Sequence, residues 1–288
     1  CRNAGDPHSS QDGRQSQFVA LCPKRLLERH VMPTTFNWIY LGTTSVVLDP
    51  TEGNSNTENA AGIVGTTWGS TTVPLYTRIT SATMINNGGN TGVLDTNNNV
   101  SNDQFTSNIG AGVQTFVYDG GGVYNVTITY ADETTATISG VIVQSTTGEL
   151  FFAPEQSANA DTVAQEAKPI VSITIGTNLI NTGDFTADRA TTGWDDGWVD
   201  GTAGNDLINA AYVEPISLGT DRIDNNDGIN SSSVNDDRVR AGAGDDTVLA
   251  GLGNDLVYGG TGADSLSGEA GVDTIYGEDG NDRLYGGD

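Results

Sequence analysis

Residues 240–288 read R-AGAGDDTVL-AGLGNDLVY-GGTGADSLS-GEAGVDTIY-GEDGNDRLY-GGD, and this stretch decides the fold of the C-terminal part of the chain. Cut every nine residues from Ala241, it gives five consecutive units and the first three residues of a sixth. Each unit has Gly at its fourth place, Asp at its sixth and an aliphatic residue at its eighth. A disordered Gly/Asp-rich linker needs no fixed period, so the repetition indicates a regular coiled structure.

The residue types in each unit point to a cation site. Glycines allow positive φ, which turns backbone carbonyls inward, and the Asp adds a carboxylate to that set of oxygens. An oxygen-only set in flexible geometry suits Ca²⁺ rather than zinc or copper. Two units make one coil of 18 residues, so every second unit stacks on the same edge. The expected edges are Asp246, Asp264 and Asp282 on one side, and Asp255 and Asp273 on the other.

Three less regular units precede the clean run, at 201–209, 216–224 and 232–240, with insertions of six and seven residues between them. The D-N-N-D-G run at 224–228 does not match an EF-hand loop, because its twelfth position would be Val234 instead of an acid. The sixth-place acids of all the units are the predicted calcium ligands. They are Asp206, Asp221, Asp237, Asp246, Asp255, Asp264, Asp273 and Asp282.

The nonapeptide G-G-x-G-x-D-x-U-x resembles the repeats-in-toxin (RTX), or hemolysin-type, calcium-binding repeat, over about residues 201–288. The resemblance implies a parallel β-roll holding Ca²⁺ and export by the type I secretion machinery of Gram-negative bacteria, with an uncleaved signal at the far C-terminus. It also implies that the roll folds on reaching calcium outside the cell. The arrangement is similar to large secreted calcium-binding proteins of marine bacteria, some of which carry a self-processing Hint (hedgehog/intein) domain after the roll.

Composition limits the partners. The chain has 288 residues with 37 acidic and 12 basic side chains, and its net charge is −25. This charge argues against nucleic acid and anionic membranes as partners, and no apolar run is long enough for a membrane span. Both cysteines and both histidines lie in residues 1–31, before the first methionine, Met32. We expect 1–31 to be a disordered upstream or non-native extension, and the rest to have no disulfide framework.

Residues 32–190 are expected to form a β-sandwich-like domain, since β-branched and aromatic residues are abundant there. The clearest strand is V-Y-N-V-T-I-T-Y at 123–130, which begins a three-stranded meander with a bulge at Gly140. Residues 86–106 are expected to be a long Asn- and Gly-rich loop. Residues 157–167 are expected to be a loop or one short helix.

The roll is expected to occupy residues 191–288. Trp194 and Trp198 lie at its start, and we expect them to cap the apolar end of the first coil. Stacking on a carbohydrate is the alternative role for this pair.

Motifs for catalysis are absent from the sequence after the first 31 residues. No His follows His30, which excludes H-E-x-x-H, and no Cys follows Cys22. The sequence contains neither G-x-S-x-G nor a phosphate-binding P-loop motif.

We therefore expect a secreted, non-catalytic calcium-binding protein with a surface or adhesion-like N-terminal domain for a cell-surface or carbohydrate ligand. The alternative is the non-catalytic front part of a larger exported enzyme or self-processing protein. Ice binding is disfavoured, because the third places of the units do not form a threonine ladder.

Overall fold

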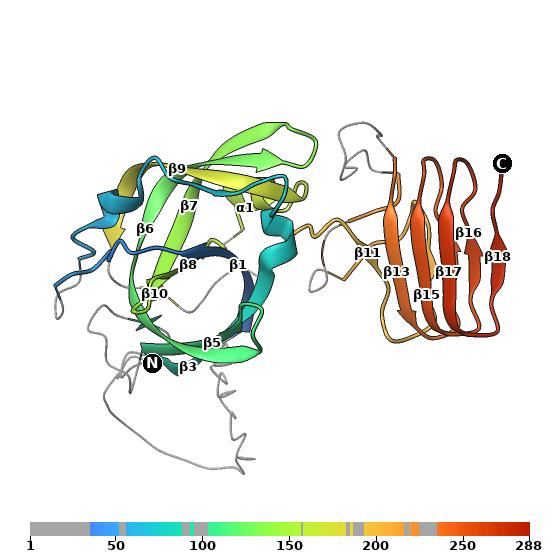
Figure 1. Ribbon diagram of the computed structural model, residues 1–288, viewed down its shortest axis with the longest axis horizontal. Coiled ribbons are helices and arrows are strands. Elements are labelled where there is room, and N and C mark those ends of the chain that lie inside the picture. The colour runs from blue at the N-terminus through green and yellow to red at the C-terminus, as the bar shows by residue number, and fades with distance from the viewer. Residues whose placement is uncertain are drawn as a thin grey trace, which may run out of the picture. The chain divides into compact units, whose positions relative to one another are not determined.

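The computed structural model describes residues 35–51, 56–87, 93–94, 103–156, 158–182, 185–186, 193–215, 219, 221–224 and 235–288. Within these ranges nearly all regular structure is β-strand (Figure 1), which confirms the prediction of an all-β protein. None of the helices in the described ranges is long and apolar enough to cross a membrane. The extension expected at residues 1–31 lies outside the described part.

The N-terminal strands form a closed barrel rather than two separate sheets. Eight of them make one antiparallel sheet in the order β2-β9-β6-β5-β3-β1-β8-β7, and β7 also pairs with β6. The ring therefore closes through six strands, while β9 and β2 continue outward from β6. The elements are β1 (Thr35–Thr43), η1 (Ala60–Ile63), β2 (Thr67–Gly69), η2 (Leu75–Arg78), β3 (Ile79–Asn87), β4 (Val93–Leu94), β5 (Asp103–Asn108), β6 (Val113–Tyr130), β7 (Thr135–Ser145), β8 (Glu149–Ala153), α1 (Ala160–Gln165), β9 (Ile170–Thr182) and β10 (Phe185–Thr186).

Closure depends on the length of β6, which serves three neighbours. Its first part pairs with β5 and its later part lies between β7 and β9. The strand β3 ends at Asn87 and β5 begins at Asp103, both inside the stretch expected to be loop, so that expectation is wrong for 86–87 and 103–106. β4 lies inside the same stretch and pairs with β10. Most of the remaining loop residues lie outside the described part.

The predicted meander is present as β6, β7 and β8. The predicted bulge at Gly140 is wrong, because Gly140 pairs with Tyr124 without a register shift. The absence of a side chain there is needed for packing: a Cβ atom would lie 2.6 Å from Val126 Cγ2 and 2.9 Å from Phe152 Cε2. The short helix is α1, whose first turn is capped by Asn159.

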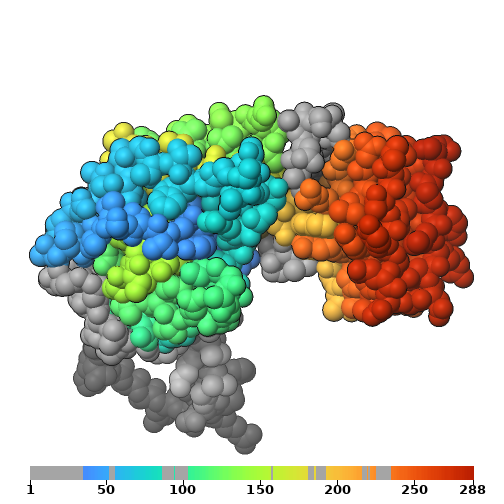
Figure 2. Space-filling model, viewed as in Figure 1, coloured from blue at the N-terminus to red at the C-terminus, as the bar shows by residue number. Residues whose placement is uncertain are grey.

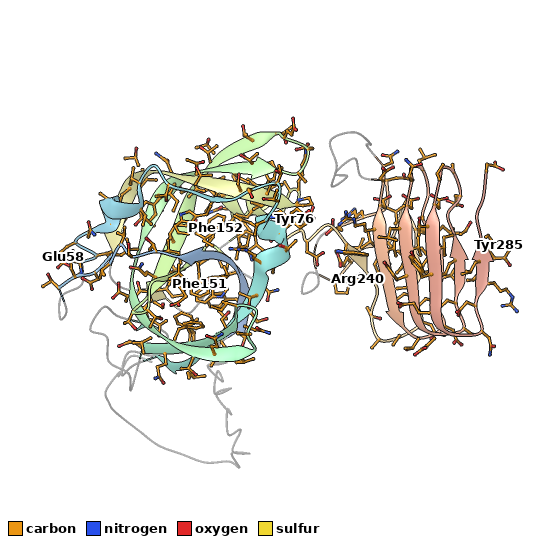
Figure 3. The ribbon with its side chains drawn as sticks, in the orientation of Figure 1. Glu58, Tyr76, Phe151, Phe152, Arg240 and Tyr285 are labelled. Atoms are coloured by element: carbon orange, nitrogen blue, oxygen red, sulfur yellow. The ribbon has the colours of Figure 1, made fainter. Side chains whose placement is uncertain are left out.

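Two apolar cores lie on opposite faces of the barrel strands. Neighbouring residues of β8 show this, since Phe151 lies inside the ring and Phe152 on its other face (Figure 3). Trp38 stacks on Phe151 in the inner core, with ring centroids 4.3 Å apart. The outer core is covered by β9, the two 3₁₀ turns and α1. The domain thus has two packed layers, as expected for a sandwich. Unlike in a sandwich, the strands of both layers belong to one continuous sheet.

The C-terminal part is a parallel roll of two four-stranded sheets, and the predicted roll is confirmed. The stacked coils form one continuous block of atoms (Figure 2). One sheet has the order β11-β13-β15-β17 and the other β12-β14-β16-β18. Their bounds are β11 (Val199–Asp200), β12 (Leu207–Ile208), β13 (Arg238–Ala243), β14 (Thr247–Leu249), β15 (Leu256–Gly262), β16 (Ser265–Ser267), β17 (Thr274–Gly280) and β18 (Arg283–Tyr285).

The register of the roll follows the nine-residue period. Val239 pairs with Val257, and Val248 with Leu266, so each residue meets its equivalent two units later. The eighth-place aliphatic residues are buried between the two sheets through Leu266 and half-exposed at Leu284 in the last coil. The eighth place therefore forms the interior of the roll, as the sequence pattern predicts.

The two tryptophans do not act as a pair. Trp194 belongs to the outer core of the N-terminal part, where it packs on Phe152 and donates a hydrogen bond of 3.0 Å to the Asn37 carbonyl. Capping of the roll by Trp194 is therefore wrong. Trp198 lies on the roll, next to Tyr258 and beneath the guanidinium of Arg240, which is 4.7 Å from its ring centroid.

Candidate metal centres

One edge of the roll carries a ladder of acidic side chains. The backbone N–H of Asp206 donates to Oδ1 of Asp246 at 2.8 Å. That of Asp246 donates to Asp264 at 2.9 Å, and that of Asp264 to Asp282 at 3.0 Å. Each carboxylate therefore holds the coil before it with one oxygen. The structure brings together the predicted residues of this edge, including Asp206 from the irregular units.

The opposite edge repeats this arrangement. The N–H of Asp237 donates to Oδ1 of Asp255 at 2.8 Å, and that of Asp255 to Asp273 at 3.0 Å. At the start of this edge, the N–H of Asp224 donates to Oδ2 of Asp237 at 2.9 Å. Asp221, the predicted residue of that unit, donates its N–H to Glu214 instead. The structure links Asp237, Asp255 and Asp273 along this edge, and in the irregular unit it links Asp224 to them instead of Asp221.

The second carboxylate oxygen of these acids is the feature that suits a cation. Oδ2 is buried and has no hydrogen-bond partner in Asp246, Asp255, Asp264 and Asp273. A buried oxygen without a partner is costly, and a charged one more so. A bound cation satisfies both the missing partner and the charge.

First-place glycines bound the space beside these oxygens. At Gly259 an added Cβ would lie 2.6 Å from Oδ2 of Asp264 in the same unit. Gly268 and Gly277 have the same relation to Asp273 and Asp282, where the added atom would overlap the carboxylate. Glycine at this place therefore keeps space open beside the free oxygens of Asp264 and Asp273, whereas the units of Asp246 and Asp255 have the small residues Ala241 and Ala250 there.

The turns also bring the backbones of successive coils close together. At the fourth place Gly244 and Gly262 have positive φ, and a side chain at Gly262 would overlap the carbonyl oxygen of Gly244. Glu269 and Glu278 occupy the second place with φ of 68° and 65°, where the other units of the clean run have Gly. The turn conformation is thus kept even where a side chain strains it.

A family model for the RTX calcium-binding nonapeptide repeat matches residues 233–266 and 258–288. These coils are RTX repeats. Repeats of this family bind Ca²⁺, which agrees with the predicted ion. No curated protein and no solved structure matches the chain.

The donors of the RTX repeats fit Ca²⁺. Carboxylate and carbonyl oxygens are the ligands that this hard cation prefers. Within the described residues no three acidic, His or Cys side chains converge on one point. Carboxylates alone therefore do not complete a coordination sphere, and backbone carbonyls of the turns have to supply the rest. The individual ligand roles of the eight predicted acids remain predictions.

Burial and neighbouring negative charges raise the pKa of two acids of the RTX coils, Asp246 and Asp255. Burial raises the pKa of Asp255 to about 7, and the negative charges of Asp273 and Asp224 add to this shift. Burial likewise raises the pKa of Asp246, with Asp264 as its foremost charged neighbour. Carboxylates in this state either take up a proton or require a positive partner.

Fifth-place side chains link the RTX coils in the other direction, which the sequence analysis missed. Asp245 Oδ1 accepts from the N–H of Ala263 at 2.8 Å, and Asn254 Oδ1 from Val272 at 2.9 Å. The recurrence of Asn or Asp before the sixth-place Asp was the available signal. In an N-D or D-D pair, the fifth-place side chain therefore accepts a hydrogen bond from the following coil and the sixth-place side chain accepts one from the preceding coil.

Glu214 is a second residue that the sequence analysis missed. It comes from the first insertion, is buried, and accepts hydrogen bonds from the N–H groups of Asp200 at 2.9 Å and Asp221 at 3.1 Å. Burial raises its pKa to about 9, with the charge of Asp221 adding to the shift. No sequence signal was available, because the insertion lies outside the period.

Proposed function

We propose that this protein is an exported calcium-binding protein whose RTX roll folds when Ca²⁺ binds. The row of buried Oδ2 atoms without partners carries the proposal, because closing the coils without a cation leaves these charges uncompensated. The roll has a thin interior of one aliphatic residue per unit, so ion binding contributes a large share of its stability.

Hydrogen exchange on the full chain tests calcium-coupled folding. Peptides from 241–288 are expected to exchange slowly in calcium and near the unfolded rate in chelator. Peptides from the barrel, such as 113–130, serve as the internal control and are expected to be protected in both. Equal protection of the roll peptides in chelator would show that the coils close without the ion.

We propose export through type I secretion machinery, which is supported by the family resemblance and by the proposed calcium-dependent folding. A roll that stays unfolded in a calcium-poor cytoplasm and folds outside is compatible with passage through a narrow channel. The test is the distribution of the protein between cells and medium when the secretion channel is deleted. Unchanged amounts in the medium would contradict this route.

For the N-terminal barrel we propose a non-catalytic role in binding a cell-surface carbohydrate. A pocket of about 270 Å³ is lined by Tyr40, Arg78 and Asn108 among others. Arg78 lies 5.7 Å from the Tyr40 ring centroid and donates to the Leu41 carbonyl. An aromatic face with amide and guanidinium donors suits a sugar ring. Glycan-array binding that Arg78→Gln and Tyr40→Ala leave unchanged would contradict this role.

The proposal has an alternative in which the chain is the front part of a larger exported enzyme or Hint-type protein. The full-length gene product separates the two. A catalytic or self-processing domain following the roll would favour the alternative while leaving calcium binding intact.

A further inference from the structure

The first coil of the Asp255 edge departs from the rest of the roll. In the clean repeats, the second-place glycine faces a backbone carbonyl of the preceding coil, as Gly260 faces the carbonyl of Gly242. At Gly251 the neighbour is the carboxylate of Asp224, and an added Cβ would overlap its Oδ2. An acidic side chain from an irregular unit thus stands beside a repeat turn.

Three constraints hold Asp224 in this place. Its N–H donates to Oδ2 of Asp237 at 2.9 Å, and its Oδ1 accepts from the N–H of Leu252 at 3.0 Å. Its φ is 58°, a conformation that costs free energy in any residue with a side chain. The backbone is therefore strained in a way that keeps the carboxylate against the turn of the next coil.

An independent observation points to a cation at this position. Asp255, in the same turn as Gly251 and Leu252, is 2% exposed, and its Oδ2 has no hydrogen-bond partner. The carboxylate of Asp224 contacts that same turn, because it accepts from the N–H of Leu252 and lies against Gly251. Two carboxylates held near each other, one with a buried free oxygen, form an incomplete oxygen set for a hard cation.

We propose that Asp224 is a ligand of an additional calcium site at the start of the Asp255 edge. There its carboxylate lies against the turn at Gly251, where Gly260 in the next coil of the other edge has a backbone carbonyl as neighbour. The site uses Oδ2 of Asp224 and Oδ2 of Asp255, together with backbone oxygens of the turn. This assignment rests on the proposed calcium binding of the roll, and it differs from the repeat pattern, which selects Asp221.

Calcium stoichiometry of the full chain, measured by isothermal titration calorimetry, tests the assignment. Asp224→Asn keeps the amide oxygen that accepts from Leu252 and removes the charge, so one site per molecule is expected to be lost or weakened at least tenfold. Asp224→Gly is the second variant, because glycine adopts positive φ without strain and the N–H to Asp237 remains. The same loss is expected there.

Asp221→Asn is the matched control. It removes the acid that the repeat pattern predicts as the ligand, and it changes the charge by the same amount as Asp224→Asn. Full stoichiometry and affinity in both Asp224 variants would overturn the assignment. Loss of the site in Asp221→Asn with retention in Asp224→Asn would overturn it as well. A wild-type chain that binds no calcium would overturn the proposed function itself, which separates the two failures.

Discussion

Replacing Asp264 by Asn separates the two roles of the sixth-place carboxylate. Asp264 is fully buried, its Oδ1 accepts from the N–H of Asp246, and its Oδ2 has no partner. Asn keeps an acceptor oxygen for that hydrogen bond and loses the charge. Because Asp264 lies between Asp246 and Asp282 on one edge, the change is expected to affect two neighbouring sites.

The expected change in the stability of the roll on Asp264→Asn has opposite signs with and without calcium. A site weakened tenfold loses about 1.4 kcal/mol of stabilisation at saturating ion, so two such sites lose about 3 kcal/mol. In chelator the variant is expected to be more stable than wild type, by on the order of 1 kcal/mol, because an unpaired buried charge has been removed.

Hydrogen exchange of peptides within 256–285 measures the free energy of opening of these coils in both conditions. Asp245→Asn is the control: it makes the same charge change at an exposed position and keeps its hydrogen bond to Ala263. If Asp264→Asn lowers calcium-dependent stability no more than Asp245→Asn, the role assigned to the buried oxygen is refuted.

Further predictions concern the same roll. Because burial raises the folded-state pKa of Asp255 to about 7, above the unfolded value of about 3.9, the metal-free roll should gain stability as pH falls from about 7 towards 4. A urea midpoint in chelator that does not depend on pH would contradict this. Glu269→Gly and Glu278→Gly should each stabilise the roll by roughly 0.5–1 kcal/mol, since their positive φ is strained; unchanged urea midpoints would argue against strain. Leu266→Ala should cost about 2–5 kcal/mol, and Leu284→Ala, half-exposed in the last coil, clearly less; equal losses in thermal unfolding would contradict this order.

The regular part of the roll is predictable from sequence because each unit has the same residue types at its fourth, sixth and eighth places. The nine-residue period fixes which residues point inward, and pairs such as Val257 with Ile275 follow from it. The alternation of acids between two edges also follows, because one coil contains two units. Asp264 and Asp273 therefore appear where the spacing places them.

The irregular units are not predictable in this way. The insertions change the path of the chain, so that Asp206 meets Asp246 across 40 residues instead of 18. Which acid faces the next turn then depends on the route of the insertion, and the structure selects Asp224 over Asp221 on the edge of Asp237. A rule based on spacing cannot distinguish two acids three residues apart.

Closure of the barrel was missed for a related reason. Alternation at Val126 and Ile128 reveals that β6 is a strand with one face buried, but not that it pairs with β5, β7 and β9 at once. Those pairings depend on residues far apart in sequence. Gly140 illustrates this, since a side chain there would collide with Val126 and Phe152, which lie on two different neighbouring strands.

The hydrogen bonds between neighbouring coils of the roll have a mechanical consequence. Hydrogen bonds such as the one from Asp246 to Asp264 lie along the stacking direction, so tension between the first and last coils loads them one layer at a time. Each released layer contains 18 residues, and an extended chain spans about 3.4 Å per residue. Pulling should therefore give a staircase with steps of roughly 60 Å, whose plateau force rises with calcium concentration.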